Sequence, residues 1–134
     1  MTPQDILAMP ADAYMNDCQK NFFRQVLLDK QGSAMESTAQ ARETLANLGN
    51  APDPADLANI EEDRQNLTRT LDRLHGQILE IRRALKAIDD GDYGWCETTG
   101  EEIGLRRLLA QPTARYSAIA QNMNESISRH YAAA

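Results

Sequence analysis

The sequence predicts a mainly α-helical protein, built on a long antiparallel coiled-coil hairpin that is followed by a small globular part and a C-terminal helix. A heptad pattern of apolar residues runs through the middle of the chain, a weaker one precedes it, and a short segment with one glycine and two prolines separates them. The expected organisation is an N-terminal segment over residues 1–13, the hairpin over 14–88 with its tip at 49–58, and a final region over 89–134.

The stronger heptad pattern lies between Leu57 and Ile88. Its ten positions are spaced alternately by three and four residues, and nine of them are apolar. This is the seam of a coiled coil, and a straight helix of this span is about 48 Å long. The exception, Arg64, can lay its aliphatic stem along the seam. The seam consists of Leu57, Ile60, Arg64, Leu67, Leu71, Leu74, Ile78, Ile81, Leu85 and Ile88.

A weaker seam upstream supplies the partner helix. The run from Tyr14 to Leu48 contains no proline, and Gly49 after it is a good helix stop. Pro52 cannot continue the first helix, whereas Pro54 suits the first position of the second one. A short break between two long amphipathic helices predicts an antiparallel hairpin. The upstream seam consists of Leu27, Gln31, Ala34, Thr38, Ala41, Leu45 and Leu48.

The pattern changes at residues 89–94, where Gly91 and Gly94 end the long helix. A compact segment is expected over residues 95–113. A final helix is expected from Tyr116 to Tyr131, with Ile119, Met123 and Ile127 on one face.

Composition restricts the possible partners. The net charge of −6 and the pI near 4.8 make duplex nucleic acid and anionic membranes unlikely ligands, since both require a basic face. Two distant cysteines, Cys18 and Cys96, fit a reducing compartment. The N-terminus lacks the features of a signal peptide, and no stretch is apolar enough to cross a membrane. We therefore expect a cytoplasmic protein that acts as a monomer.

Catalytic constellations are missing from the sequence. His75 and His130 stand alone, without the adjacent nucleophile that a catalytic base needs, and there is no phosphate-binding glycine loop. We therefore expect that the chain is not an enzyme. A structural zinc site needs two closely spaced pairs of Cys or His ligands, whereas Cys96 is followed three residues later by Thr99. Cys96 is expected to be a buried, small apolar residue.

Charge is distributed unevenly along the second helix. Residues 53–63 contain five acids and no base, whereas residues 64–86 contain six bases and two acids. One interpretation is that these charges compensate the helix dipole. The other is that the hairpin carries an acidic probe at its turn.

Two segments of this chain resemble the DksA/TraR family. The runs Asp92–Leu108 and Pro112–Ala114 resemble the family's finger, and Asp53–Ala58 resembles its D-x-x-D-x-A tip motif. The resemblance spans roughly Ala34 to Ile127. Together the tip, the heptad arm and the finger are a specific combination.

The finger departs from the family at its metal ligands, and it is therefore a degenerate zinc-finger-like region. The chain is similar to the zinc-independent members of the family, so we expect no zinc or other metal, and a finger held by packing. The four ligand positions fall on Cys96, Thr99, Ser117 and Ala120. The apolar residues expected in the substitute core are Trp95, Ile103, Leu105, Leu108, Leu109 and Ile119.

The resemblance implies a transcription factor that binds RNA polymerase directly and does not bind DNA. The hairpin would enter the secondary channel, with Asp53, Asp56 and Ala58 at the tip positions near the active site. Arg73 falls on an arm position that helps to dock on the polymerase, although a solvated helix charge is an equal interpretation. The implied effect is to destabilise open complexes at ribosomal RNA promoters in the stringent response, and to activate some amino-acid promoters.

The resemblance also implies ppGpp as a co-regulator at the polymerase interface. The family's basic positions for ppGpp become Glu80, Gln111 and Gln121 here, so synergy with ppGpp would use other groups. Arg106 and Arg107 match the family pattern, either as contacts or as structural donors inside the finger.

Two other functions compete with this one. A helical hairpin can clamp a different assembly in the manner of a chaperone, which accounts for the heptads and the acidity but not for the finger. A transcript-cleavage factor of the same channel would use Asp53 and Asp56 to hold magnesium.

Overall fold

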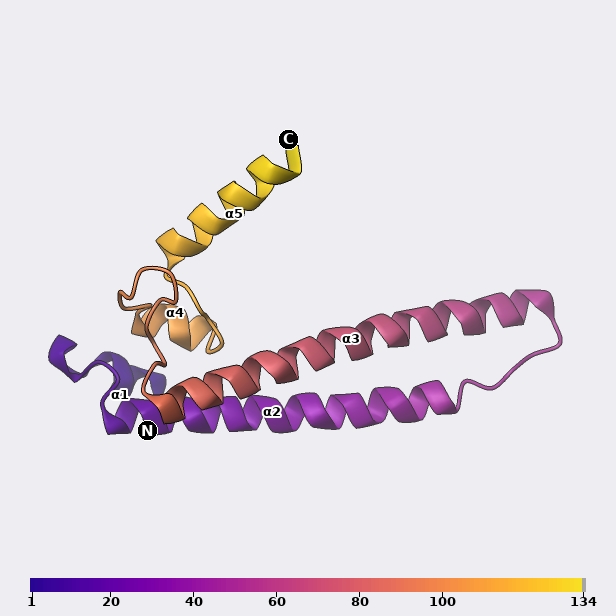
Figure 1. Cartoon of the computed structure of the whole chain (residues 1–134). Helices are drawn as coiled ribbons and strands as arrows, with labels where there is room; N and C mark the ends of the chain where they lie inside the picture. Colours follow the sequence, from indigo (N-terminus) through magenta and orange to yellow (C-terminus); the bar gives the residue numbers. More distant parts are fainter. Residues whose placement is uncertain (134) are drawn as a thin grey trace. The chain divides into compact units, whose positions relative to one another are not determined.

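The computed structural model describes residues 1–133, and helices make up most of it (Figure 1). Helices α2 and α3 pack side by side as an antiparallel hairpin, which confirms the predicted fold class. Within residues 1–133 the only paired extended backbone is an isolated antiparallel bridge between Trp95 and Glu102. The elements are α1 (Pro3–Leu7), the 3-10 turn η1 (Ala11–Ala13), α2 (Asp17–Ala46), α3 (Pro54–Asp90), α4 (Leu105–Ala110) and α5 (Ala118–Ala133).

The chain divides into two compact units. One unit is Leu28–Arg82, and the other combines Met1–Leu27 with the chain from Arg83 onward. In the first unit the two helices meet along the predicted seam, where Ala34, Leu74 and Ile78 form a buried cluster. The seam positions from 31 to 48 and from 60 to 81 are all buried or half-buried, which confirms the heptad assignment.

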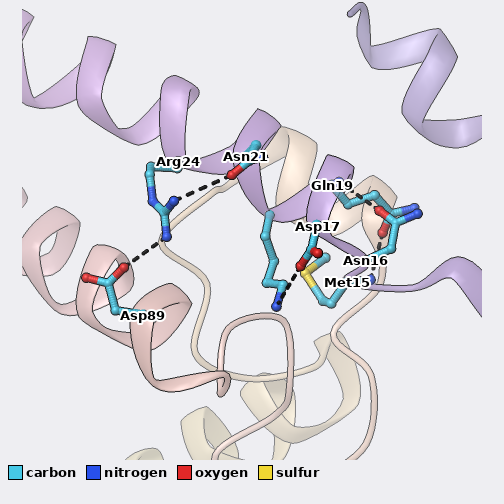
Figure 2. A network of polar contacts seen from close by, with 8 residues as sticks. Met15, Asn16, Asp17, Gln19, Asn21, Arg24 and Asp89 are labelled. Atoms are coloured by element: carbon cyan, nitrogen blue, oxygen red, sulfur yellow. Dashed lines mark hydrogen bonds and ion pairs between the residues drawn. The ribbon is translucent and has the colours of Figure 1, made fainter.

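Helix α2 begins where a side chain satisfies its free N–H groups. The Oδ1 atom of Asn16 accepts the N–H of Gln19 at 2.8 Å, and Gln19 in turn accepts the N–H of Met15 through Oε1 at 2.8 Å (Figure 2). The bond to Asn16 is an N-cap bond of the kind that stabilises the start of a helix. Gln19 is fully buried, and its side chain is satisfied because Oε1 accepts the N–H of Met15 and Nε2 donates to Met9 Sδ at 3.5 Å.

The second unit has a core of large side chains. Phe23 and Leu27 of α2 are fully buried, and the ring of Phe23 lies 5.6 Å from that of Tyr93. On the surface, Arg24 donates to Asp89 of α3 at 2.9 Å (Figure 2). This exposed ion pair contributes at most about 1 kcal/mol, so burial of the large side chains dominates.

The N-terminal segment is anchored to the second unit. Ile6 of α1 is fully buried, and α1 packs against α4. A capping box starts α1: Thr2 Oγ1 accepts the N–H of Asp5 at 3.2 Å, and Asp5 Oδ2 accepts the N–H of Thr2 at 2.8 Å. The backbone hydrogen bond from Thr2 lowers the pKa of Asp5.

Helix α3 ends as the sequence predicts. Gly91 has a φ of 83°, which glycine adopts without a steric penalty. Its N–H bonds to the carbonyl of Ile88 at 3.3 Å, and the N–H of Asp92 bonds to the carbonyl of Ala87 at 2.9 Å. This pair of bonds is a Schellman motif, which satisfies the last carbonyls of the helix.

Gly76 lies within α3, exposed, and a Cβ atom there meets nothing within 4 Å. Gly76→Ala is therefore expected to raise the free energy of unfolding by about 0.5–1 kcal/mol, because alanine loses less backbone entropy in a helix. Urea denaturation of both proteins measures this change. A lower free energy of unfolding in the variant would contradict the prediction.

None of the helices within residues 1–133 is long and apolar enough to cross a bilayer.

Candidate functional site

The turn between α2 and α3 places two carboxylates at the beginning of α3. Gly49 has a φ of 70° after the end of α2, a conformation that favours glycine. Pro54 occupies the first helical position, and Asp53 Oδ1 accepts the N–H of Ala55 at 2.9 Å. The carbonyl of Asp53 accepts the N–H of Leu57 at 2.9 Å, so Asp53 is the N-cap of α3.

Asp56, three residues further on, is free of such bonds. Its side chain is exposed and makes no hydrogen bond or ion pair with any of residues 1–133. Leu57 beside it is 40% exposed, although it occupies a seam position, and Ala58 is exposed as well. The turn therefore exposes a carboxylate and a small apolar surface to solvent.

The arm of α3 carries one further predicted residue, Arg73. Its guanidinium is exposed and has no hydrogen-bonding or ionic partner in the described part of the chain. Arg64 and Arg69 differ, because Arg64 donates to Glu61 at 3.2 Å and Arg69 to Asn66 at 3.2 Å. Arg73 is thus available for an anionic group outside the chain.

The finger brings three of its four ligand positions together. Cys96 is 3% exposed, as predicted, and its thiol accepts hydrogen bonds from the side chain of Thr99 and from the N–H of Ser117. Ser117 Oγ also accepts the N–H of Ala120 at 3.2 Å, and Ala120 is 2% exposed. A sulfur, two hydroxyls and a methyl group therefore occupy the four ligand positions.

These contacts change the acidity of the thiol. Burial raises the pKa of Cys96, but the hydrogen bonds from Thr99, Ser117 and Thr98 together lower it by more. The resulting pKa is about 6. Donors that point at a sulfur stabilise its anionic form. The neutral donors around Cys96 therefore favour the thiolate form over the thiol.

Side chains from outside the ligand positions also hold the finger. The hydroxyl of Tyr93 donates to the carbonyl of Pro112 at 2.8 Å, and burial raises its pKa. Arg83 of α3 donates to the carbonyl of Thr113 at 2.7 Å and to Glu97 at 3.3 Å. Two sequence-distant halves of the finger are joined by these bonds.

Arg107 of α4 is a structural donor, since its Nε donates to the carbonyl of Tyr116 at 2.8 Å. Arg106 beside it is exposed and makes no hydrogen bond or ion pair within residues 1–133. Of the two arginines, Arg107 is therefore the structural donor inside the finger, and Arg106 is the one left exposed for a contact.

Tyr14 connects the N-terminal segment to the finger. Its hydroxyl donates to the carbonyl of Gly94 at 2.6 Å and accepts the N–H of Gly104 at 3.1 Å. Burial raises the pKa of Tyr14, although the bond from Gly104 opposes it. Its ring packs edge-on against Trp95, with ring centroids 5.3 Å apart.

Gly94→Ala is expected to lower the free energy of unfolding by about 1–3 kcal/mol, because φ is 90° there and the new Cβ would lie 2.9 Å from Met15 Cγ. Gly100→Ala is the matched control, with a φ of 74° but nothing within 4 Å. Thermal or urea denaturation should show the larger loss for Gly94→Ala. An equal loss in both variants would contradict a role for the close contact.

The prediction of the finger core was correct only in part. Ile103 and Leu108 are buried, and Leu105 and Leu109 are half-buried. Trp95 is 39% exposed, because it covers Tyr14 from outside, and Ile119 is 75% exposed on α5. The supports from Tyr14, Tyr93 and Arg83 were not predicted, because residue type was the only sign of them in the sequence.

Comparisons with known proteins match most of the chain. Residues 19–88 match the family "DnaK suppressor protein DksA, N-terminal domain", and residues 91–122 match "Prokaryotic dksA/traR C4-type zinc finger".

Individual relatives match over a similar extent. The RNA polymerase-binding transcription factor DksA of Caulobacter vibrioides (strain NA1000 / CB15N) is 42% identical over 122 residues, covering 88% of this chain and 84% of the relative. The protein of the same description from Escherichia coli (strain K12) is 37% identical over 106 residues, covering 78% and 70%. The structure of transcription factor DksA2 from Pseudomonas aeruginosa superposes with a TM-score of 0.87 at 41% identity, over 96% of this chain and 100% of that one.

One of these matches corrects the prediction about metal. We expected no zinc, whereas residues 91–122 match a C4-type zinc finger, which points to zinc binding. The expectation of no zinc was therefore wrong. It was based on missing ligands alone, and it gave too little weight to a scaffold that otherwise follows the zinc-binding pattern.

The donor atoms of this chain do not fit a C4 site. Such a site uses four thiolates, whereas the cysteines here are Cys96 in the finger and Cys18, which is exposed on α2. In residues 1–133 no three His, Cys, Asp or Glu side chains lie close enough to share a metal ion.

Proposed function

Because the chain belongs to the DksA/TraR family, we propose that it is a transcription factor that binds RNA polymerase. The relatives from Caulobacter and Escherichia are described as RNA polymerase-binding transcription factors, and this chain covers most of their length. Its net charge of −6 favours a protein partner over DNA, because no excess of cations is available to neutralise phosphates. This function requires no catalytic group of its own.

The hairpin turn is proposed as the working end. It would enter the secondary channel of the polymerase and bring Asp56 near the active site. The observation that carries this proposal is the exposed, unpartnered carboxylate of Asp56 on a capped helix end. A carboxylate with no internal partner gives up only its bonds to water on binding, and hydrogen bonds to a charged group are stronger than neutral ones. Ala58 would be a position where a larger side chain does not fit.

The arm is proposed to dock on the rim of the channel. The free guanidinium of Arg73 would pair with an acidic group there. Binding would then be shared between the arm, which supplies affinity, and the turn, which supplies the effect on transcription. The proposed effect is a shorter lifetime of open complexes at ribosomal RNA promoters in the stringent response.

The test is the lifetime of open complexes on a ribosomal RNA promoter, with purified polymerase and this protein. We expect a shorter lifetime that depends on protein concentration, and capture of polymerase subunits by the immobilised protein in the absence of DNA. Unchanged lifetimes at concentrations that saturate polymerase binding would contradict the proposed effect. Absence of polymerase from the capture would contradict the proposed partner.

A further inference from the structure

We infer that the two acids of the turn have different tasks: Asp53 positions the turn by capping α3, and Asp56 contacts the partner. This inference rests on the proposed function, because it divides that function between two side chains. From the sequence, both acids were expected among the tip residues, with Asp56 as the strongest candidate for a contact and no separate task for Asp53. It is carried by the contacts that each carboxylate makes.

The carboxylate of Asp53 is already engaged. Its Oδ1 accepts the N–H of Ala55 at 2.9 Å, and its carbonyl accepts the N–H of Leu57 at 2.9 Å. Both bonds belong to the first turn of α3, the turn that contains Asp56. A partner that displaced Oδ1 of Asp53 from this position would have to compete with the Ala55 bond, which satisfies an otherwise free N–H of the helix.

The two prolines support this task. A residue that precedes proline is held near the extended conformation, which is the conformation that an N-cap residue needs. Asp53 precedes Pro54, and Pro52 fixes the backbone on its other side. Pro54 itself has no N–H to satisfy at the first helical position. The turn is thus restricted before any partner arrives.

A comparison within the chain shows that Asp56 is left out of the cap. In α1 the acid at the corresponding position, Asp5, bonds back to the N–H of the capping residue Thr2 at 2.8 Å. Asp56 holds the same place in α3, three residues after its cap, but makes no such bond within residues 1–133. Its carboxylate therefore remains available, while Asp53 keeps the turn ordered.

Three substitutions of Asp53 separate charge from capping. Asp53→Asn keeps the Oδ1 acceptor without the charge, Asp53→Ala removes both, and Asp53→Glu keeps the charge but moves it away from the Ala55 N–H by one methylene. Amide hydrogen exchange at Ala55 and Leu57 should be about fivefold faster in the Ala and Glu variants than in the Asn variant. Thr2→Ala is the control, because it removes a cap in α1 and should leave exchange at the turn unchanged.

The same variants are then compared in the open-complex assay. We expect the Ala and Glu variants to need about fivefold more protein than the Asn variant for the same shortening of lifetime. Equal activity of the Asn and Ala variants, or higher activity of the Glu variant than of the Asn variant, would overturn the inference, since charge would then matter more than the cap. If the wild-type protein has no effect on lifetimes, the proposed function fails together with the role of Asp53 on polymerase. The amide exchange rates at Ala55 and Leu57 are measured without polymerase. Equal rates in all variants would therefore refute the capping role of Asp53 independently of the open-complex assay.

Discussion

Asp56→Asn is expected to leave binding to RNA polymerase close to that of the wild type and to abolish the effect on open complexes. Replacing one carboxylate oxygen by an NH2 group removes the charge but keeps the size of the side chain. Asp56 makes no bond within residues 1–133, so its replacement leaves no group of the protein unpaired. The fold should tolerate the change at a cost of about 0.3–1 kcal/mol, from the lost interaction of a charge with the helix dipole.

The loss of function has a separate physical cause. A hydrogen bond to a charged group contributes about 1.5–3 kcal/mol, which corresponds to a factor of ~10 or more in the equilibrium between intact and dissociated open complexes. The measurements are the affinity for polymerase and the lifetime of open complexes, both over a titration of protein. Because Arg73 and the rest of the arm are unchanged, affinity should be preserved.

Asp63→Asn is the matched control for this experiment. Asp63 is an exposed acid of the same helix, outside the tip, and it too has no hydrogen-bonding partner in the described chain. It undergoes the same chemical change, so it should retain the effect on open complexes. Parallel loss of binding and activity in Asp56→Asn, or equal defects in both variants, would contradict the division of tasks between arm and turn.

The helical hairpin could be predicted from the sequence because its signal is repeated. Each step of three or four residues along the seam from Leu57 to Ile88 tests the same register, and a helix that presents such a seam needs a second helix to cover it. The turn was equally clear, since Gly49, Pro52 and Pro54 have defined backbone preferences. Local rules of this kind do not depend on the rest of the fold.

The finger was harder to predict because its contacts join residues that are distant in the sequence. Tyr14 reaches Gly104, 90 positions away, and Arg83 reaches Thr113, 30 positions away. No periodicity encodes such bonds. Ile119 illustrates the converse error: its spacing with Met123 and Ile127 correctly indicates one apolar face of a helix, but spacing does not reveal whether anything covers that face.

The assignment of tasks at the turn also needed the structure. From the sequence, Asp53 and Asp56 are two acids of one motif, and dipole compensation applies to both. Only the bond from the Ala55 N–H to Asp53 distinguishes the cap from the free carboxylate.

At the base of the hairpin, two adjacent leucines of α2 differ sharply in burial, and they should differ in the same way in their contribution to stability. Leu27 is fully buried, whereas Leu28 is 43% exposed. Leu27→Ala should lower the free energy of unfolding by about 2–5 kcal/mol, because it removes buried methyl groups and leaves a cavity that the surrounding residues refill only partly. Leu28→Ala makes the same chemical change at a surface position and should cost about 1 kcal/mol or less.

Urea denaturation of the two variants measures this difference directly, since the pair shares its helix, its propensity change and its effect on the unfolded chain. The difference between the two losses in the free energy of unfolding therefore measures the contribution of burial at Leu27. Similar losses in the two variants would mean that Leu27 is not packed as the structure shows. A loss confined to Leu27→Ala would instead establish that the heptad seam continues through this position, where its burial holds the first helix of the hairpin in register.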